Sequence, residues 1–337
     1  MPSVTELYSG ILTGLHLEPR HETLAKKLII NVAPTGSFTN RAQNPLQPYT
    51  MEENVKAAVD AYKAGAAVWH VHAREKDGLP SKDPYVMKET IDRVLDQCPD
   101  MITSVIPYVD YDCPSGLDSI KRCVDVLTAA GPEYMQSAVM LLQSTSFSEK
   151  FTYVVTRDIL TAQVQYLEDH GVRPEYQGHG YSGLKDVMDW LLATGVGKQP
   201  ALMNVMMGFH GFSHGSPLGP DPWNYIYMMT MQQTMWPGSV RGVCAGGRNW
   251  LPFTTLAIML GFDMVRVGME DSVYLYPHRD EKIRTSAEAV RKVVNIANEM
   301  GREIATPAEA RQIMGLRIPG QRPVAAKAGA AASAVTA

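Results

Sequence analysis

The chain has 337 residues, of which 45% are hydrophobic, so it can bury a substantial core in one large α/β domain or in two smaller ones. Its 31 basic and 35 acidic residues give a formal charge of −4 without a basic stripe, which argues against nucleic acid or an anionic membrane as a partner. Because no apolar run could span a membrane, no secretion signal opens the chain and the four cysteines lack CxxC spacing, we expect a cytoplasmic protein with a small-molecule partner.

Short β-rich apolar runs alternate with longer amphipathic runs from Lys27 onward, as in repeated βα units. The predicted strands cover residues 28–32, 67–73, 101–106, 134–140, 173–177, 202–207, 240–244 and 263–267. The predicted helices cover residues 52–64, 84–95, 117–130, 154–170, 184–193, 222–235, 252–260 and 281–300. Thr50 and Glu53 have the spacing of a capping box at the start of the first helix.

Eight βα units predict an α/β fold of the (β/α)8 TIM barrel type, with the active site at the carboxyl ends of the strands. A doubly wound sheet is the competing topology, but the turn after the first strand reads Ala-Pro-Thr-Gly-Ser rather than GxGxxG. We expect residues 1–26 to be an extension or a subunit contact, 27–318 to form the barrel, and the Ala-rich tail at 319–337 to be disordered.

Two histidines, His70 and His72, stand two residues apart in the second predicted strand. Alternate residues of a strand share a face, and their Cα atoms lie roughly 6.6 Å apart, so both imidazoles can reach one metal ion such as zinc. Arg74 continues the same face. The alternative interpretation is a pair of polar residues that close the end of a strand.

The eighth predicted strand places Arg266, Gly268 and Glu270 on one face. Since this strand closes the barrel beside the first, only one strand separates it from the histidines, and Glu270 can complete a His₂Glu site with open positions for substrate. Asp271 is a candidate general base that Arg266 would keep ionised. An ordinary ion pair that closes the barrel is the alternative for these two residues.

Several motifs together resemble the β-keto acid cleavage enzymes, whose founding activity is 3-keto-5-aminohexanoate cleavage. The resemblance extends from about Leu28 to Leu316. The matching motifs are APTG at 33–36, AGAAVWHVHAR at 64–74, DGLPS at 77–81, AGGR at 245–248, RVGMED at 266–271 and GREIATP at 301–307.

This resemblance implies a zinc-dependent acyl transfer in which a β-keto acid and acetyl-CoA give acetoacetate and a new CoA thioester. By the same resemblance, His70, His72 and Glu270 would bind Zn²⁺, and Arg266 with Asp271 would remove the C2 proton of the keto acid. It also implies a homo-oligomer, with a tetramer suspected.

The chain departs from the family where the substrate is expected to bind. Phe38 replaces a glutamate that is associated with an amino-bearing substrate, and Ile106 and Gln136 align approximately with an expected serine and threonine, so 3-keto-5-aminohexanoate is in doubt as the substrate. The residues expected to contact the keto acid are Thr35, Gly36, Gln136, His179 and His210. Gly247 and Arg248 follow the seventh strand, where barrels often bind phosphate, and are expected to hold part of CoA.

His179 and His210 also support a rival interpretation, a binuclear metal hydrolase of the amidohydrolase type. Two features oppose it: the His pair would belong on the first strand, and the fourth strand has no bridging lysine. A non-enzymatic metal-binding module is disfavoured because an incompletely ligated ion beside an Arg and an Asp suits catalysis better than structure.

Overall fold

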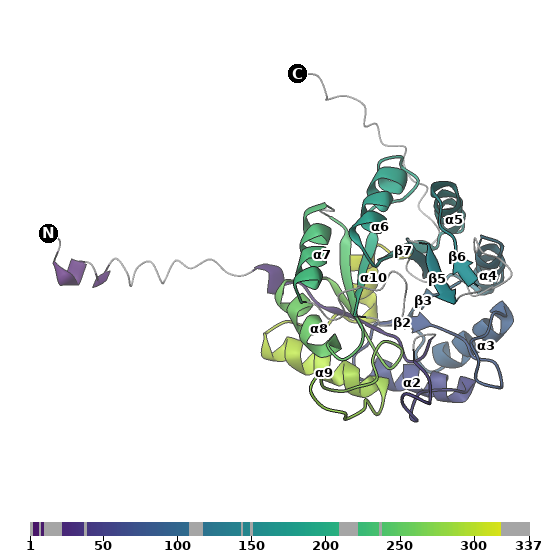
Figure 1. Ribbon diagram of the computed structural model, residues 1–337, viewed down its shortest axis with the longest axis horizontal. Coiled ribbons are helices and arrows are strands. Elements are labelled where there is room, and N and C mark those ends of the chain that lie inside the picture. The colour runs from purple at the N-terminus through teal and green to yellow at the C-terminus, as the bar shows by residue number, and fades with distance from the viewer. Residues whose placement is uncertain are drawn as a thin grey trace, which may run out of the picture.

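Eight parallel strands close into a barrel in the order β1-β10-β9-β8-β7-β4-β3-β2, and helices surround it (Figure 1). The computed structural model describes residues 3–6, 8–9, 22–36, 39–107, 117–142, 144–148, 151–208, 222–235 and 238–317. The fold is a (β/α)8 TIM barrel, as the alternating runs predict. The tail at 319–337 and most of the first 21 residues lie outside the described ranges.

Each of the eight predicted strands is present: five are shorter than predicted by one to three residues, one has the predicted bounds, and two run one residue further. The barrel strands are β1 (Ile29–Val32), β2 (Val68–Val71), β3 (Ile102–Val105), β4 (Ser137–Leu141), β7 (Arg173–Gly178), β8 (Leu202–Met207), β9 (Val240–Ala245) and β10 (Met264–Val267). Buried β-branched residues and methionines dominate them, because a parallel barrel sheet is covered on both faces.

The outer layer follows the predicted order of helices, with a short 3-10 turn at Glu22–Leu24 before it. Its elements are α2 (Met51–Lys63), α3 (Pro84–Leu95), α4 (Leu117–Ala130), α5 (Arg157–Asp169), α6 (Tyr181–Asp186), the π-helix Val187–Leu192, α7 (Pro222–Met235), α8 (Trp250–Met259) and α9 (Ser286–Glu299). The capping box of Thr50 and Glu53 is confirmed at the start of α2. Among the described residues, no helix combines the length and apolar character needed to cross a bilayer.

Two helices, α5 and α9, begin later than predicted because capping decided their starts. α5 begins after Thr156, whose side chain accepts a hydrogen bond from the Ile159 amide, and α9 begins after Thr285, whose side chain accepts one from the Glu288 amide. Apolar periodicity alone extended both helices a few residues too far toward the N-terminus.

Two further elements are absent from the prediction. A hairpin of β5 (Thr145–Ser148) and β6 (Phe151–Tyr153) follows β4. Helix α10 (Pro307–Met314) returns beneath the barrel, and the segment before it runs beside β1, where Leu28 pairs with Ile304.

The hydrophobic core has two parts. The larger part fills the space between the strands and the surrounding helices. The smaller part fills the amino-terminal half of the barrel interior and is closed by α10 and the residues next to it. Its members are Ile29, Ala67, Val68, Ile102, Leu202, Val240, Met264, Ala305, Ala310, Met314 and Leu316.

Candidate active site

The site residues reach one place because β1 lies between β2 and β10. Asn31 of β1 pairs with Val68 on one side and with Arg266 on the other. After β10 the chain crosses close to β1: a Cβ atom on Gly268 would lie 2.1 Å from the carbonyl oxygen of Ala33, and φ at this glycine is +151°. This glycine turn brings the residues that follow β10 beside the histidines that end β2.

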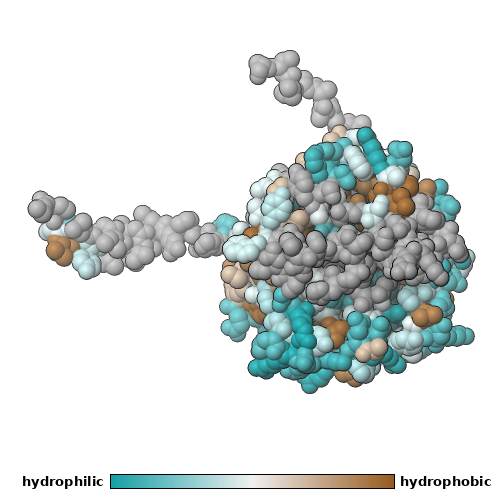
Figure 2. All heavy atoms as spheres, in the orientation of Figure 1, coloured by the Kyte–Doolittle hydropathy of each residue, from teal (hydrophilic) through white to brown (hydrophobic). Residues whose placement is uncertain are grey.

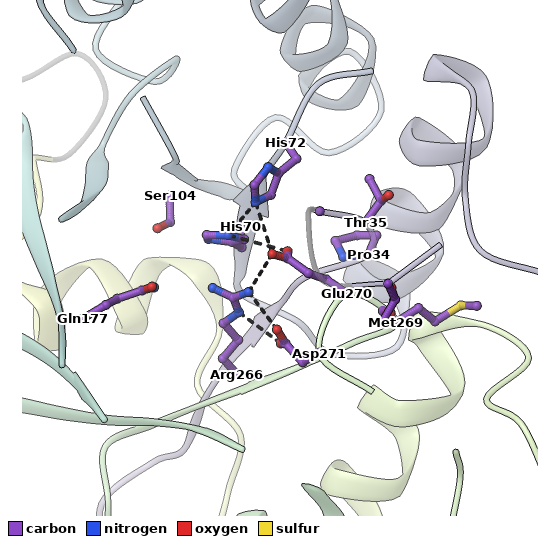
Figure 3. Close-up of polar contacts among 12 residues, drawn as sticks. Pro34, Thr35, His70, His72, Ser104, Gln177, Arg266, Met269, Glu270 and Asp271 are labelled. Carbon is purple, nitrogen blue, oxygen red and sulfur yellow. Dashed lines mark hydrogen bonds and ion pairs between the residues drawn. The ribbon is translucent and has the colours of Figure 1, made fainter. Parts of the chain in front are cut away.

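His70, His72 and Glu270 form a compact, buried group of possible metal ligands (Figure 3). The Nε2 atoms of the two histidines are 3.1 Å apart, and they lie 3.6 Å and 3.2 Å from the nearer Glu270 carboxylate oxygens. One ligand atom from each residue lies within 4.8 Å of the other two. Two imidazole nitrogens and one carboxylate oxygen are the donors that zinc and related cations accept.

Two features of this group fit a divalent cation. Glu270 Oε2, which faces the ligand group, is buried without a hydrogen-bond partner, although buried polar atoms are nearly always paired. Burial also lowers the pKa of His70 well below its usual value, which keeps its imidazole neutral and able to donate a lone pair. Three protein ligands would leave a coordination position for substrate.

Arg266 clamps Asp271 beside this group. Its Nε and Nη2 atoms donate to the two Asp271 carboxylate oxygens at 3.0 Å and 2.8 Å, and Nη2 also lies 3.1 Å from Glu270 Oε1. Burial raises the pKa of Asp271 to about 6, although Arg266 opposes this shift. Arg266 and Asp271 therefore form the ion pair that was the alternative interpretation, but this pair lies within the candidate site. With a pKa near 6, the Asp271 carboxylate can exchange a proton near neutral pH.

A short loop after β1 supports the Glu270 carboxylate. A Cβ atom on Gly36 would lie only 2.0 Å from Glu270 Cδ, so any larger side chain there would displace the carboxylate. Arg74 holds the loop: it donates through Nε to the Thr35 hydroxyl at 3.1 Å and through Nη2 to the Gly36 carbonyl at 2.6 Å. Arg74 was assigned no role from the sequence, although its position on the histidine face was a signal.

A second polar group in the barrel interior was missed by the sequence analysis. Glu175 of β7 is fully buried and accepts a hydrogen bond from the Ser104 hydroxyl at 2.6 Å and another from the Asn204 amide. Ser104 pairs in register with His70, and Figure 3 shows Ser104 and Gln177 on the side of His70 away from Glu270. Polar residues at alternate positions of predicted strands were the available signal.

The assignment of Gln136 to the substrate pocket is wrong. Gln136 precedes β4 at the amino-terminal end of the barrel, and its side chain accepts a 2.9 Å hydrogen bond from Arg311 of α10. Its alternation partners Ala138 and Met140 pack toward the outer helices, so the inward-facing neighbour is Ser137. An alignment error of one residue moves a side chain to the other face of a strand.

Of the two histidines of the hydrolase interpretation, only His179 lies among the described residues, and it joins no second group of potential metal ligands there. His179 directly follows β7 and is half-buried, but it is not part of the ligand group, and His210 lies outside the described residues. In the part of the chain that the structure describes, one group of three potential metal ligands is found, and it consists of His70, His72 and Glu270. The hydrolase alternative therefore gains no support.

The predicted CoA-binding residues lie next to the dyad. The Gly247 amide donates to the Asp271 carbonyl at 2.9 Å. Arg248 follows on the surface, where it pairs with Asp280 at 2.5 Å and stacks on Tyr274, with its guanidinium carbon 3.6 Å from the ring centroid.

Comparisons with known proteins identify relatives of this chain. The chain is 32% identical over 296 residues to the 3-keto-5-aminohexanoate cleavage enzyme of Acetoanaerobium sticklandii, an alignment that covers 86% of this chain and 99% of the relative. It is 26% identical to the 3,5-dioxohexanoate:acetyl-CoA acetone transferase of Paraburkholderia graminis, with 87% and 96% of the two chains covered.

A solved structure shares the fold. The ternary complex of ObcA with a C4-CoA adduct and oxalate superimposes with a TM-score of 0.65 at 20% identity, over 81% of this chain and 68% of that one. The family profile described as beta-keto acid cleavage enzyme matches residues 27–316. With the relatives above, this match shows that the chain belongs to the β-keto acid cleavage enzyme family.

Proposed function

We propose that this protein is a zinc-dependent acyltransferase that cleaves a β-keto acid with acetyl-CoA, giving acetoacetate and a new acyl-CoA. The observation that carries the proposal is the juxtaposition of the His70, His72 and Glu270 ligand group with an arginine-clamped Asp271 at the mouth of the barrel. These three ligands would hold the ion, which would supply a Lewis acid for the keto oxygen of the substrate.

The first step of the proposed reaction is removal of a C2 proton by Asp271. Two hydrogen bonds from Arg266 fix the orientation of this carboxylate, and burial brings its pKa to about 6, near the range in which a general base operates well. Arg266 also contacts Glu270, so one guanidinium group positions both the proposed base, Asp271, and a proposed metal ligand.

The remaining steps need no nucleophilic side chain. The C2 carbanion attacks the thioester carbonyl of acetyl-CoA, a carbon–carbon bond forms, and the CoA thiolate leaves. The thiolate then attacks the original keto carbon, the bond between that carbon and C2 breaks, and the new thioester is released. The acetoacetate enolate takes back the proton from Asp271, so atoms and charges balance.

The experiment that tests the proposal uses a panel of β-keto acids with zinc-loaded protein, with and without acetyl-CoA, and follows acetoacetate and new CoA thioesters by mass spectrometry. Thioester formation that requires both reactants is the expected result. Loss of the keto acid without acetyl-CoA would contradict the acyl transfer and point to hydrolysis.

Metal content provides an independent test of the ligand group. His70→Ala removes one of three buried donors and should abolish both bound zinc and turnover. Retention of metal and turnover in this variant would overturn the assigned site. The homo-oligomer, with a tetramer suspected, stays a prediction that light scattering of the purified protein tests.

A further inference from the structure

A cluster of cations and tyrosines lies on the rim of the barrel next to the candidate active site. It comprises Arg248, Tyr274, Tyr276, Arg279 and Lys292, which we call the rim cluster. Tyr274, Tyr276 and Arg279 come from the loop between β10 and α9, Lys292 from α9 itself, and Arg248 from the turn before α8. None of these five residues belongs to the metal ligand group or to the dyad, although Glu270 and Asp271 stand earlier in the same loop between β10 and α9.

The rim cluster is connected to the dyad through one residue. Gly247 donates its amide to the Asp271 carbonyl at 2.9 Å, and the next residue, Arg248, stacks on Tyr274. Tyr274 itself follows Asp271 by three residues along the loop. A ligand that reaches into the barrel to Asp271 can therefore extend outward over Arg248.

The outer part of the cluster presents cations around one aromatic ring. The Tyr276 ring has Lys292 Nζ at 4.5 Å and the Arg279 guanidinium carbon at 5.4 Å from its centroid. Lys292 also bonds the Tyr276 hydroxyl at 2.9 Å, and Arg279 Nε bonds His278 at 3.2 Å. Neither of these two hydrogen bonds is made to a carboxylate, so an anionic ligand would not have to displace one from Arg279 or Lys292.

The charge of this region differs in sign from that of the whole chain. Residues 278–292 together with Arg248 contain six basic and three acidic side chains, whereas the chain has a formal charge of −4. In Figure 2, hydrophilic side chains cover the lower rim of the visible face, where Figure 1 places the loop before α9. A local positive potential of this kind attracts and orients an anionic ligand.

We propose that the rim cluster binds the adenosine 3′-phosphate 5′-diphosphate portion of the acyl-CoA substrate. Arg279 and Lys292 would contact its phosphates, and the Arg248–Tyr274 stack would offer a planar surface to its adenine. The pantetheine arm separates the nucleotide from the thioester, so a thioester beside Asp271 places the nucleotide outside the barrel mouth. This inference rests on the proposed function for the identity of the substrate.

The test compares acetyl-CoA with acetyl-pantetheine, which carries the same thioester but no nucleotide. The double variant Arg279→Ala, Lys292→Ala removes both phosphate contacts and should raise KM for acetyl-CoA about tenfold or more, which corresponds to a loss of about 1.4 kcal/mol or more of binding free energy. Its kcat/KM with acetyl-pantetheine should stay unchanged. Arg291→Ala, an exposed cation on the same helix, is the matched control and should change neither.

Equal effects of the double variant on both thioesters, or no effect on either, would overturn the inference. Direct binding of adenosine 3′,5′-bisphosphate by calorimetry keeps the rim cluster testable apart from turnover: binding that the double variant loses supports it, and absence of binding to the wild-type protein contradicts it. Equally strong binding of inorganic phosphate would mean a simple anion site and would also contradict the nucleotide assignment. If wild-type protein binds the bisphosphate but turns over neither thioester, the proposed reaction fails while the rim cluster stands.

Discussion

The two halves of the barrel interior differ in chemistry. In the amino-terminal half the inward side chains are apolar, among them Ile29, Ile102 and Leu202, and α10 closes this end. In the carboxyl-terminal half they include histidines, carboxylates and an arginine, most of them fully buried. A buried apolar layer stabilises the fold, whereas a buried polar layer costs desolvation free energy. The amino-terminal half of the interior therefore contributes mainly to stability, and the carboxyl-terminal half holds the side chains of the candidate site.

Two arginine–aspartate pairs, one at each end of β10, differ in the same way. Asp263, just before the strand, pairs with Arg241 at 3.3 Å and retains some solvent exposure. Asp271, just beyond the other end of the strand, is held by Arg266 at 2.8 Å with almost no exposure and a pKa raised by burial. Similar residue types therefore serve as a structural pair at one end and as a candidate acid–base dyad at the other.

The largest expected effect comes from breaking the dyad. Asp271→Asn should lower kcat by about 10²–10⁴-fold, because the amide cannot accept the C2 proton. Zinc content should persist, since all three ligands remain. The measurement is kcat together with deuterium exchange at C2 of the keto acid by NMR.

Asp263→Asn is the matched control for that experiment. It changes the same residue type beside the same strand but at the apolar end, and kcat should stay within twofold. A comparable fall in kcat in both variants would mean that Asp271 acts through stability rather than through proton transfer.

A core substitution in the amino-terminal half of the barrel interior should lower stability but leave turnover unchanged. Leu202→Ala empties part of the apolar layer and should lower the free energy of unfolding by about 2–5 kcal/mol, as measured by urea denaturation. Turnover per folded molecule should be retained. Loss of turnover at full folding would show that the two halves are not functionally separate.

A smaller effect is expected from the loop that supports the metal ligand. Gly36→Ala places a Cβ where the Glu270 carboxylate lies, and zinc affinity should fall about 10–100-fold with little loss of stability. Competition with a chromogenic chelator measures the affinity. Gly195→Ala, where the added Cβ meets open space, should leave zinc affinity unchanged.

The smallest effect is expected at Gln136. Gln136→Ala removes its hydrogen bond from Arg311 and should cost about 1 kcal/mol of stability without raising KM for the keto acid. Thermal unfolding and steady-state kinetics measure the two quantities. An increase in KM with unchanged stability would restore Gln136 to the substrate pocket.

Most of the fold could be predicted because it depends on local patterns. The alternation of apolar runs is sufficient for eight strands and their helices, whereas α10, the hairpin of β5 and β6 and the 3-10 turn at Glu22–Leu24 are described elements that it did not predict. The hairpin and α10 both lack the long periodic pattern of a βα unit, although Thr306 and Glu309 form a capping box that marks the start of α10.

The sequence by itself determined that His70 and His72 share a face, because a strand has a side-chain period of two. Alternation does not account for Glu270, because β10 ends at Val267 and the Gly268 turn places the residues that follow. Only the tertiary structure decided that Gly36 and Arg74 support the Glu270 carboxylate, that Glu175 joins the barrel interior and that Gln136 lies at the opposite end. The physical reason is that alternation is local, whereas the contacts between distant segments depend on the register with which the barrel closes.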